Sequence, residues 1–304
     1  MAISAKDVQA LREMTGVGMM KCKEALVATE GDMDKAVEYL REKGLAAAQK
    51  KAGRVAAEGV SYAASINGVG VLVEVNAETD FVAKNDKFVE FVHGVAEVVA
   101  KEDPADLEAL MAAKYLDTGR TVTEEQQEKV LVIGENIQVR RFARYAAGVS
   151  VAYVHMAGKI GVLVNLDTDL ALDKVEAVGK DVAMQIAALN PRFLDKSQVD
   201  QATLDEEKKV MLAQMENDPK MASKPEKVRE GIVVGKMGKF YKENCLLQQE
   251  FVKDGSMTVE QYVASSAKTL GGTITVKGYT RYETGEGIEK REENFAEEIA
   301  KLQK

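Results

Sequence analysis

The sequence contains an internal repeat, and this repeat limits the folds that the chain can adopt. Three short motifs recur 89 to 91 residues later: Gly59-Val60-Ser61 as Gly148-Val149-Ser150, Gly70-Val71-Leu72-Val73 as Gly161-Val162-Leu163-Val164, and Thr79-Asp80-Phe81 as Thr168-Asp169-Leu170. Each copy predicts a strand, a turn, a strand, a loop and a helix. Asn67-Gly68 between apolar runs is a strong β-hairpin signal. The sequence therefore predicts an α+β fold with two related core subdomains, over 55–147 and 148–270.

The first copy carries an aromatic residue on its strand-to-helix connection. The apolar run over 69–75 predicts a strand, and the apolar spacing over 88–95 predicts a helix. Phe81 lies between them, where a rigid scaffold can present a side chain to a partner. In the alternative interpretation, Thr79 or Asp80 caps a short turn and Phe81 packs back onto the core.

The second copy has Leu170 at the position of Phe81. An aromatic side chain is therefore not a requirement of the shared fold, which favours a role for Phe81 beyond packing. Because both residues are apolar, this comparison alone leaves both interpretations open.

Residues 4–43 predict a bundle of three short helices that can dock on a partner. The loop Thr15-Gly16-Val17-Gly18 separates the first two helices, and Asp32 caps the third, over 33–43. In the second helix we expect a buried face of Met19, Cys22, Ala25 and Leu26, with Met20 and Lys23 outside it. Residues 44–58 form an Ala-rich connector with a basic cluster, a run that is either a solvated helical face or a partner contact, and 1–54 form the first predicted domain.

The part of the chain after the second repeat predicts a projecting helical arm. Two long polar helices joined by a proline-marked turn cannot bury much surface on each other, so a hairpin over about 198–230 should extend from the body. Such an arm serves docking or dimerisation, or it is an inert insertion. The remaining expectations are helices over 104–116 and 123–132, a strand over 138–145, and a C-terminal module over 271–304 with a strand at 273–279 and an amphipathic helix from Ile288 to Leu302.

The charge and the apolar runs exclude several classes of protein. The chain has 304 residues with a net charge of −8 and an isoelectric point near 5.2, which disfavours nucleic acid as the main partner. No apolar run approaches the roughly 20 residues of a membrane span, and the N-terminus does not resemble a signal peptide. Two distant cysteines fit free thiols in a reducing cytoplasm.

The sequence offers no recognisable catalytic equipment. Its two histidines, His93 and His155, have no neighbouring metal ligands, and the glycine pair Gly16-x-Gly18 is not a phosphate-binding loop. Neither a nucleophile motif nor a close carboxylate pair on an apolar face can be identified. We therefore expect no cofactor and no metal, and a protein that acts by binding rather than as an enzyme.

Several motifs together resemble the bacterial elongation factor Ts family, the guanine-nucleotide exchange factors of elongation factor Tu. The resemblance covers nearly the whole chain and rests on these segments: Met14 to Lys23, Lys50-Lys51-Ala52-Gly53, Glu78-Thr79-Asp80-Phe81-Val82-Ala83, Ile133 to Ile137, His155, Lys159 to Val164, and Gly285 to Lys290. Val17 stands where alanine is common. The resemblance implies an N-terminal ubiquitin-associated-like bundle, a two-subdomain core, a coiled-coil hairpin and a short C-terminal module.

The resemblance also implies the partner, the activity and the residues that act. Elongation factor Tu, GDP-bound or nucleotide-free, would be the partner in the cytoplasm, and Asp80, Phe81, Val82 and Ala83 would dislodge its Mg²⁺ and open the nucleotide site so that GTP can rebind. The other contacts implied are Arg12, Met19, Met20, Lys23, Lys51, Ile133, Gly134 and His155. The arm would reach elsewhere on the partner or form a homodimer with a second copy.

Two rival functions follow from the same residues. A passive adaptor or chaperone would dock through the N-terminal bundle without altering the nucleotide. A ribosome- or RNA-binding protein would use Lys50, Lys51, Arg54 and the arginines of 140–144, although the acidic total argues against it.

Overall fold

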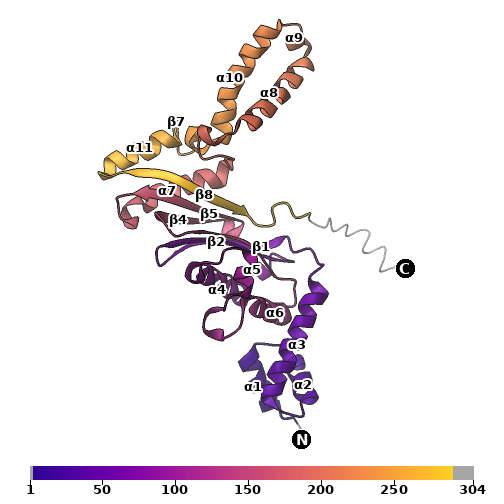
Figure 1. Cartoon of the computed structure of the whole chain (residues 1–304). Coiled ribbons are helices and arrows are strands. Elements are labelled where there is room, and N and C mark those ends of the chain that lie inside the picture. Colours follow the sequence, from indigo (N-terminus) through magenta and orange to yellow (C-terminus); the bar gives the residue numbers. More distant parts are fainter. Residues whose placement is uncertain (1–2, 290–304) are drawn as a thin grey trace.

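The computed structural model describes residues 3–289 and has an elongated shape, with a helical bundle at one end and a helical arm at the other (Figure 1). Mixed helices and strands make up the body between them, as the predicted α+β class requires. The described helices and strands are grouped below by the part of the molecule that they build.

The N-terminal bundle has the three helices that the sequence predicts, and their ends follow the expected caps. Ser4 and Asp7 form a reciprocal capping box, and Gly16 ends the first helix with a left-handed φ of 67°. Asp32 caps the third helix by accepting from the Lys35 amide. The helices are α1 (Ala5–Thr15), α2 (Met19–Ala28) and α3 (Met33–Lys51).

Two expectations for this bundle were wrong. The third helix continues to Lys51, past its expected end at Lys43, so the first part of the expected connector belongs to this helix. Met19 is 46% exposed, because it is the first residue of α2 and lies beyond the buried face formed by Cys22, Ala25 and Leu26. Met20 is 77% exposed, as expected.

The first core unit is a three-stranded antiparallel sheet covered by helices on one face. Its strand order is β1-β2-β3, and α4 packs against β1 and β2 through a continuous apolar face that includes Phe88 and Phe91. The elements are β1 (Glu58–Ile66), β2 (Val69–Ala77), α4 (Asp86–Glu102), α5 (Leu107–Ala112), α6 (Val122–Ile133) and β3 (Gln138–Tyr145).

The second unit repeats the pattern of the first, as the sequence predicts. A hairpin is again followed by a covering helix, and the strand order is β4-β5-β8. The expected C-terminal module separated the last strand from this unit, whereas β8 pairs with β5 along its length and completes the second sheet. The elements are β4 (Val149–His155), β5 (Ile160–Thr168), α7 (Leu172–Leu189), β6 (Glu250–Phe251), β7 (Asp254–Thr258), α11 (Val259–Leu270) and β8 (Ile274–Glu283).

The two sheets pack face to face through the motif that the repeat duplicates. Leu72 and Leu163, the third residues of the two Gly-Val-Leu-Val copies, are fully buried in one small cluster between the sheets. A Cβ at Gly161 would lie 2.6 Å from Leu72 and 2.8 Å from the Ser61 carbonyl oxygen, so this approach requires glycine. The repeated motif therefore makes the interface between its own two copies.

A buried carboxylate ties the C-terminal end of β8 to the first sheet. Glu74 is fully buried and accepts from Arg140 Nη1 at 2.9 Å, Arg141 Nε at 2.5 Å and the Gly285 amide at 2.9 Å. Burial alone would raise the pKa of Glu74, but these hydrogen bonds outweigh it and hold the pKa below the usual 4.5.

The arm extends from the second unit as a helical hairpin (Figure 1). Its second helix continues to Asn244, well past the predicted boundary near 230, and the pair encloses a small apolar cluster that includes Met215, Val233 and Phe240. The arm elements are α8 (Gln201–Glu216), α9 (Pro219–Ala222) and α10 (Glu226–Asn244), and the short helices of the chain are η1 (Val82–Lys84), η2 (Leu116–Thr118), η3 (Met156–Gly158), η4 (Lys196–Gln198) and η5 (Leu246–Gln248). The helix predicted from Ile288 to Leu302 lies outside the described residues beyond Glu289.

Candidate partner-binding surface

Phe81 projects into solvent from the short connection between β2 and α4. Its side chain is 80% exposed, whereas Val82 beside it is buried in the first core and anchors the connection. Asn85 caps α4 by accepting from the Lys87 amide at 3.0 Å. The alternative in which Phe81 packs onto the core is therefore wrong, and so is the expected cap by Thr79 or Asp80.

The equivalent loop of the second copy is built differently. Leu170 is half-buried and packs against the second core, and the Asp169 carboxylate accepts from the Thr273 amide at 2.6 Å. Asp80, by contrast, is exposed and makes no side-chain hydrogen bond with any residue in 3–289. One loop of the repeat is thus used for packing, and the other presents an aromatic ring and a carboxylate.

Two neighbouring loops of the first unit hold each other by reciprocal hydrogen bonds. The Glu135 carboxylate accepts from the Thr79 amide at 3.0 Å and from Thr79 Oγ1 at 2.7 Å. In return, the Asn136 amide donates to Glu78 Oε1 at 2.6 Å. These bonds place the expected contact residues Ile133 and Gly134, at the end of α6, beside the loop that carries Phe81.

Three lysines attach the N-terminal bundle to the core, each through a backbone carbonyl. Lys87 Nζ donates to the Gly16 carbonyl at 3.1 Å, and Lys21 Nζ donates to the Leu131 carbonyl at 2.8 Å. Lys51 Nζ donates to the Gly134 carbonyl. All three acceptors lie at helix C-termini, where carbonyls lack helical partners and the helix dipole favours a cation. Lys51 is therefore used inside the protein, and desolvation lowers its pKa.

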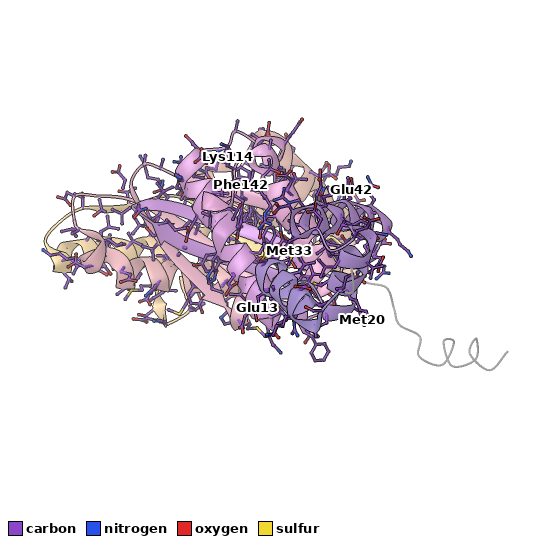
Figure 2. The ribbon with its side chains drawn as sticks, turned by 90° about the horizontal axis from the view of Figure 1, so that it is seen from below. Glu13, Met20, Met33, Glu42, Lys114 and Phe142 are labelled. Atoms are coloured by element: carbon purple, nitrogen blue, oxygen red, sulfur yellow. The ribbon has the colours of Figure 1, made fainter. Side chains whose placement is uncertain are left out.

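The bundle presents exposed apolar and basic side chains on the same part of the molecule. Met19 and Met20 are exposed on the first turn of α2, Lys23 is exposed on its next turn, and Arg12 is exposed in the last turn of α1. Viewed from below, Met20 and Glu13 lie toward one side of the molecule, while Lys114 lies toward the opposite side (Figure 2). The contact between Lys87 and Gly16 places the start of α2 close to the Phe81 connection.

His155 lies in the second unit but at the same end of the two sheets. It is exposed at the end of β4, and its Nδ1 is 2.9 Å from Tyr153 Oη. Lys159 reaches Glu58 at 3.7 Å, and Glu58 pairs with Ala77 directly before the Phe81 connection. The hydrogen bonds between loops thus place Ile133-Gly134 and the start of α2 near residues 80–83. His155 lies in the second unit, at the end of the sheets where the Phe81 connection begins.

The bonds that assemble this surface were not predicted from the sequence. Glu78, Glu135 and Lys87 are exposed or half-exposed charged residues in loops or first turns, a pattern that is usually a solvated surface. Their partners are 56 to 71 residues away, so no local spacing marks them.

The basic segment 140–144 is engaged within the protein. Arg140 and Arg141 bind Glu74, Arg141 also binds Glu286, and Arg144 binds Asp103 at 2.7 Å. These contacts leave little of the segment for a phosphate backbone, which argues further against the RNA-binding alternative.

The described residues contain neither a metal centre nor a membrane segment. Within 3–289 no three His, Cys, Asp or Glu side chains are grouped so that they could hold a metal ion. None of the helices in that range combines the length and the apolar composition that crossing a membrane requires.

Comparison with known proteins identifies the family. The sequence model of the family described as "Elongation factor TS" matches residues 78–286. Proteins named "Elongation factor Ts" from Clostridium perfringens (strain SM101) and Clostridium kluyveri are 49% and 47% identical to this chain, with 99% and 98% of each chain covered. One from Magnetococcus marinus is 45% identical, with 99% of both chains covered. The match extends over the bundle, both sheets and the arm, and the chain belongs to the elongation factor Ts family.

Proposed function

We propose that this chain is a translation elongation factor that binds elongation factor Tu in the cytoplasm and accelerates the release of its GDP. The observation that carries the proposal is the exposure of Phe81 on a connection whose neighbours are fixed on both sides. An exposed phenyl ring in a restrained loop gains free energy only when a partner covers it. Family membership supplies the identity of the partner.

The proposed partner is a GTPase, and the structure of a GTPase nucleotide site explains how the Phe81 ring can cause the release of GDP. Backbone amides around the phosphates and a bound Mg²⁺ hold the nucleotide. Because Mg²⁺ requires near-ideal octahedral geometry, a small shift of the elements that support it weakens binding sharply. Packed helices have discrete arrangements, so a ring inserted between two of them imposes such a shift.

The magnitudes are consistent with one aromatic residue making a large contribution. Burying a Phe side chain contributes about 1.5–3 kcal/mol, and coupling between two sites typically amounts to about 1–3 kcal/mol. Coupling is reciprocal, so this protein and the nucleotide weaken each other's binding by the same factor. GTP rebinding therefore releases the factor from its partner.

The other surface residues supply affinity in this proposal. Met19 and Met20 bury apolar surface on the partner, Arg12 and Lys23 add charge at the edge of that contact, and Ile133, Gly134 and His155 extend it across the core. Asp80 leaves its carboxylate available to groups near the partner's metal. No covalent chemistry and no cofactor are required, so the protein acts by binding and not as an enzyme.

The arm provides a second contact, either with the partner or with a second copy of this chain. The side chain of Val234 on α10 is 72% exposed and is the most exposed valine of the hairpin. The molecular mass of the protein in solution, measured with and without elongation factor Tu, distinguishes a contact with the partner from a homodimer, because a homodimer forms in the absence of the partner.

The central experiment is release of labelled GDP from elongation factor Tu with and without this protein. Phe81→Ala should reduce the acceleration of GDP release roughly 10- to 100-fold, the equivalent of about 1.5–3 kcal/mol. It should leave the melting temperature of the protein unchanged. Leu170→Ala is the matched variant, because it occupies the same place in the repeat but packs inward. It should lower the melting temperature and leave exchange intact.

Unchanged acceleration by Phe81→Ala would exclude the wedge. Binding to elongation factor Tu with no acceleration by the wild-type protein would favour the passive adaptor instead.

A further inference from the structure

The connection that carries Phe81 is held by polar bonds to distant parts of the chain at its N-terminal side. Within the described residues, the hydrogen bonds of the backbone from Asp80 to Asn85 are local, such as Lys84 N to Phe81 O at 3.2 Å and Asn85 N to Val82 O at 2.9 Å. The long-range bonds are made just before it, by Thr79 with Glu135 and by Glu78 with Asn136 and Arg54. The direction in which Phe81 projects thus depends on a residue 54 positions later in the sequence.

Both oxygens of the Glu135 carboxylate take part in this contact. One oxygen accepts from the Thr79 amide and the other accepts from the Thr79 hydroxyl. Two acceptor bonds to one residue fix both the position and the rotation of that residue's backbone, and bonds to a charged group are stronger than neutral ones. Thr79 precedes Phe81 by two residues, so little freedom remains between the anchor and the ring.

A second pair of bonds makes the contact rigid. Glu78 accepts from the Asn136 amide at 2.6 Å, and Asn136 Nδ2 donates to the Arg54 carbonyl at 2.8 Å. Residues 78–79 and 135–136 therefore hold each other from both sides. The segment 133–134 lies directly before Glu135, so the same bonds set the spacing between two parts of the proposed partner-binding surface.

We infer that Glu135 is a positioning residue for nucleotide exchange, which acts through Phe81 by holding Thr79. This inference rests on the proposed exchange function. It assigns to Glu135 no contact with the nucleotide or with the partner's metal. Its contribution is to hold the ring in one orientation within the complex, so that the ring acts on the nucleotide site whenever the partner is bound.

The inference predicts that loss of the Glu135 contact lowers the maximal rate of GDP release more than it lowers the affinity for elongation factor Tu. Glu135→Ala removes both acceptors, and Thr79→Val removes only the hydroxyl donor and keeps the side-chain shape. We expect Glu135→Ala to lower the maximal GDP-release rate about 10-fold and to change the half-saturating concentration less than about 3-fold. Thr79→Val should have a smaller effect, and Glu97→Gln, on the exposed face of α4, should have none.

Combination with Phe81→Ala tests whether Glu135 acts through the ring. Residues that act as a unit are non-additive, so the double variant Glu135→Ala/Phe81→Ala should release GDP at the rate of Phe81→Ala alone. Additive losses would overturn the inference, as would a loss that lies entirely in the half-saturating concentration.

Amide hydrogen exchange of the free protein provides a test that needs no partner. Glu135→Ala should raise exchange at the amides of 79–85 at least 10-fold and leave the buried amides of 88–99 unchanged. Unaltered protection of 79–85 would overturn the inference even if the wild-type protein accelerates release. Failure of the wild-type protein to accelerate release would overturn the exchange function and with it the role of Glu135 in exchange, whereas altered protection would still show that Glu135 holds the loop.

Discussion

The ammonium group of Lys87 lies 3.1 Å from the carbonyl oxygen of Gly16, so the first turn of α4 is joined to the loop between α1 and α2. This contact connects the two apolar parts of the proposed surface, Phe81 on the core and Met20 on the bundle. It also connects segments that are 71 residues apart in the sequence.

Lys87→Met should loosen the bundle without unfolding it. The variant keeps the length of the side chain but removes the donor, and one exposed hydrogen bond contributes about 0.5–1.5 kcal/mol. We expect affinity for elongation factor Tu to fall about 3- to 10-fold, with the maximal release rate unchanged. Both quantities are measured by titrating the variant in the labelled-GDP release assay. Lys101→Met, at the other end of α4, is the matched control, and equal losses in both variants would contradict this prediction.

Met20→Ala should weaken partner binding and leave stability intact. At 77% exposure the side chain buries little in the free protein, so its removal should change the free energy of unfolding by less than about 0.5 kcal/mol. Calorimetry of the complex should show a loss of about 1 kcal/mol or more, because the thioether would be covered there. Met14 is also exposed, at 64%, but it lines a groove beside Leu45 and Leu131, and Met14→Ala should bind normally.

Glu74→Gln should destabilise the protein in a pH-dependent manner. Removing one partner of a buried ion pair costs about 3–5 kcal/mol, and the partly exposed arginines place this case near 3 kcal/mol. Because the native pKa of Glu74 lies below 4.5, its contribution is complete above 4.5 and is lost as pH falls through the native pKa.

Urea unfolding at a series of pH values measures this loss. The difference between the wild-type protein and Glu74→Gln should be largest near neutral pH and should narrow in acid. Glu260→Gln, on the surface of α11, should match the wild-type protein throughout. A difference that stays constant with pH would show that Glu74 is not the titrating group.

Both cysteine thiols should be inert in the native protein. Cys22 and Cys245 are fully buried, and burial raises the pKa of each, that of Cys245 to about 11. At about pH 8 roughly one Cys245 thiol in a thousand is ionised, and the thiolate is the reactive form. A colorimetric thiol reagent should therefore label two thiols per chain only after denaturant is added. Rapid labelling of one thiol in the native state would contradict this expectation.

Local patterns in the sequence predicted most of the secondary structure. The repeated Gly-Val-Leu-Val motif gave the central hairpin strands of both sheets, and Asn67-Gly68 gave the first turn correctly. The error in α3 has a physical reason, because Gly44 would ordinarily weaken a helix. Here Gly44 is buried where α3 packs on α6, and a Cβ at this position would make only ordinary contact, 3.5 Å from the Gln127 carbonyl oxygen. Packing between the two helices therefore outweighs the weak helix preference of glycine, and the helix continues.

Long-range pairing is what the sequence did not reveal. The second partner of β5 is β8, whose alternation over 273–279 predicted a strand but not its neighbour. For the candidate site, the apolar character of Phe81 was evident but its exposure was not, because a ring and a leucine fit the same pattern. The carboxylate of Glu135 and the ammonium group of Lys87 act on segments that only the fold brings close.

The position of β8 has a consequence for how the protein is made. The three strands of the first sheet lie within residues 58–145, so all are available early on a growing chain. The second sheet waits for its third strand until the whole arm has been synthesised, and Glu74 waits for the Gly285 amide. Since domains tend to form in order of synthesis, ribosome-bound chains that stop before residue 274 should protect β1 to β3 against proteolysis and leave β4 and β5 sensitive. The unit that carries Phe81 would then be complete while the unit that packs against its sheet is still being synthesised.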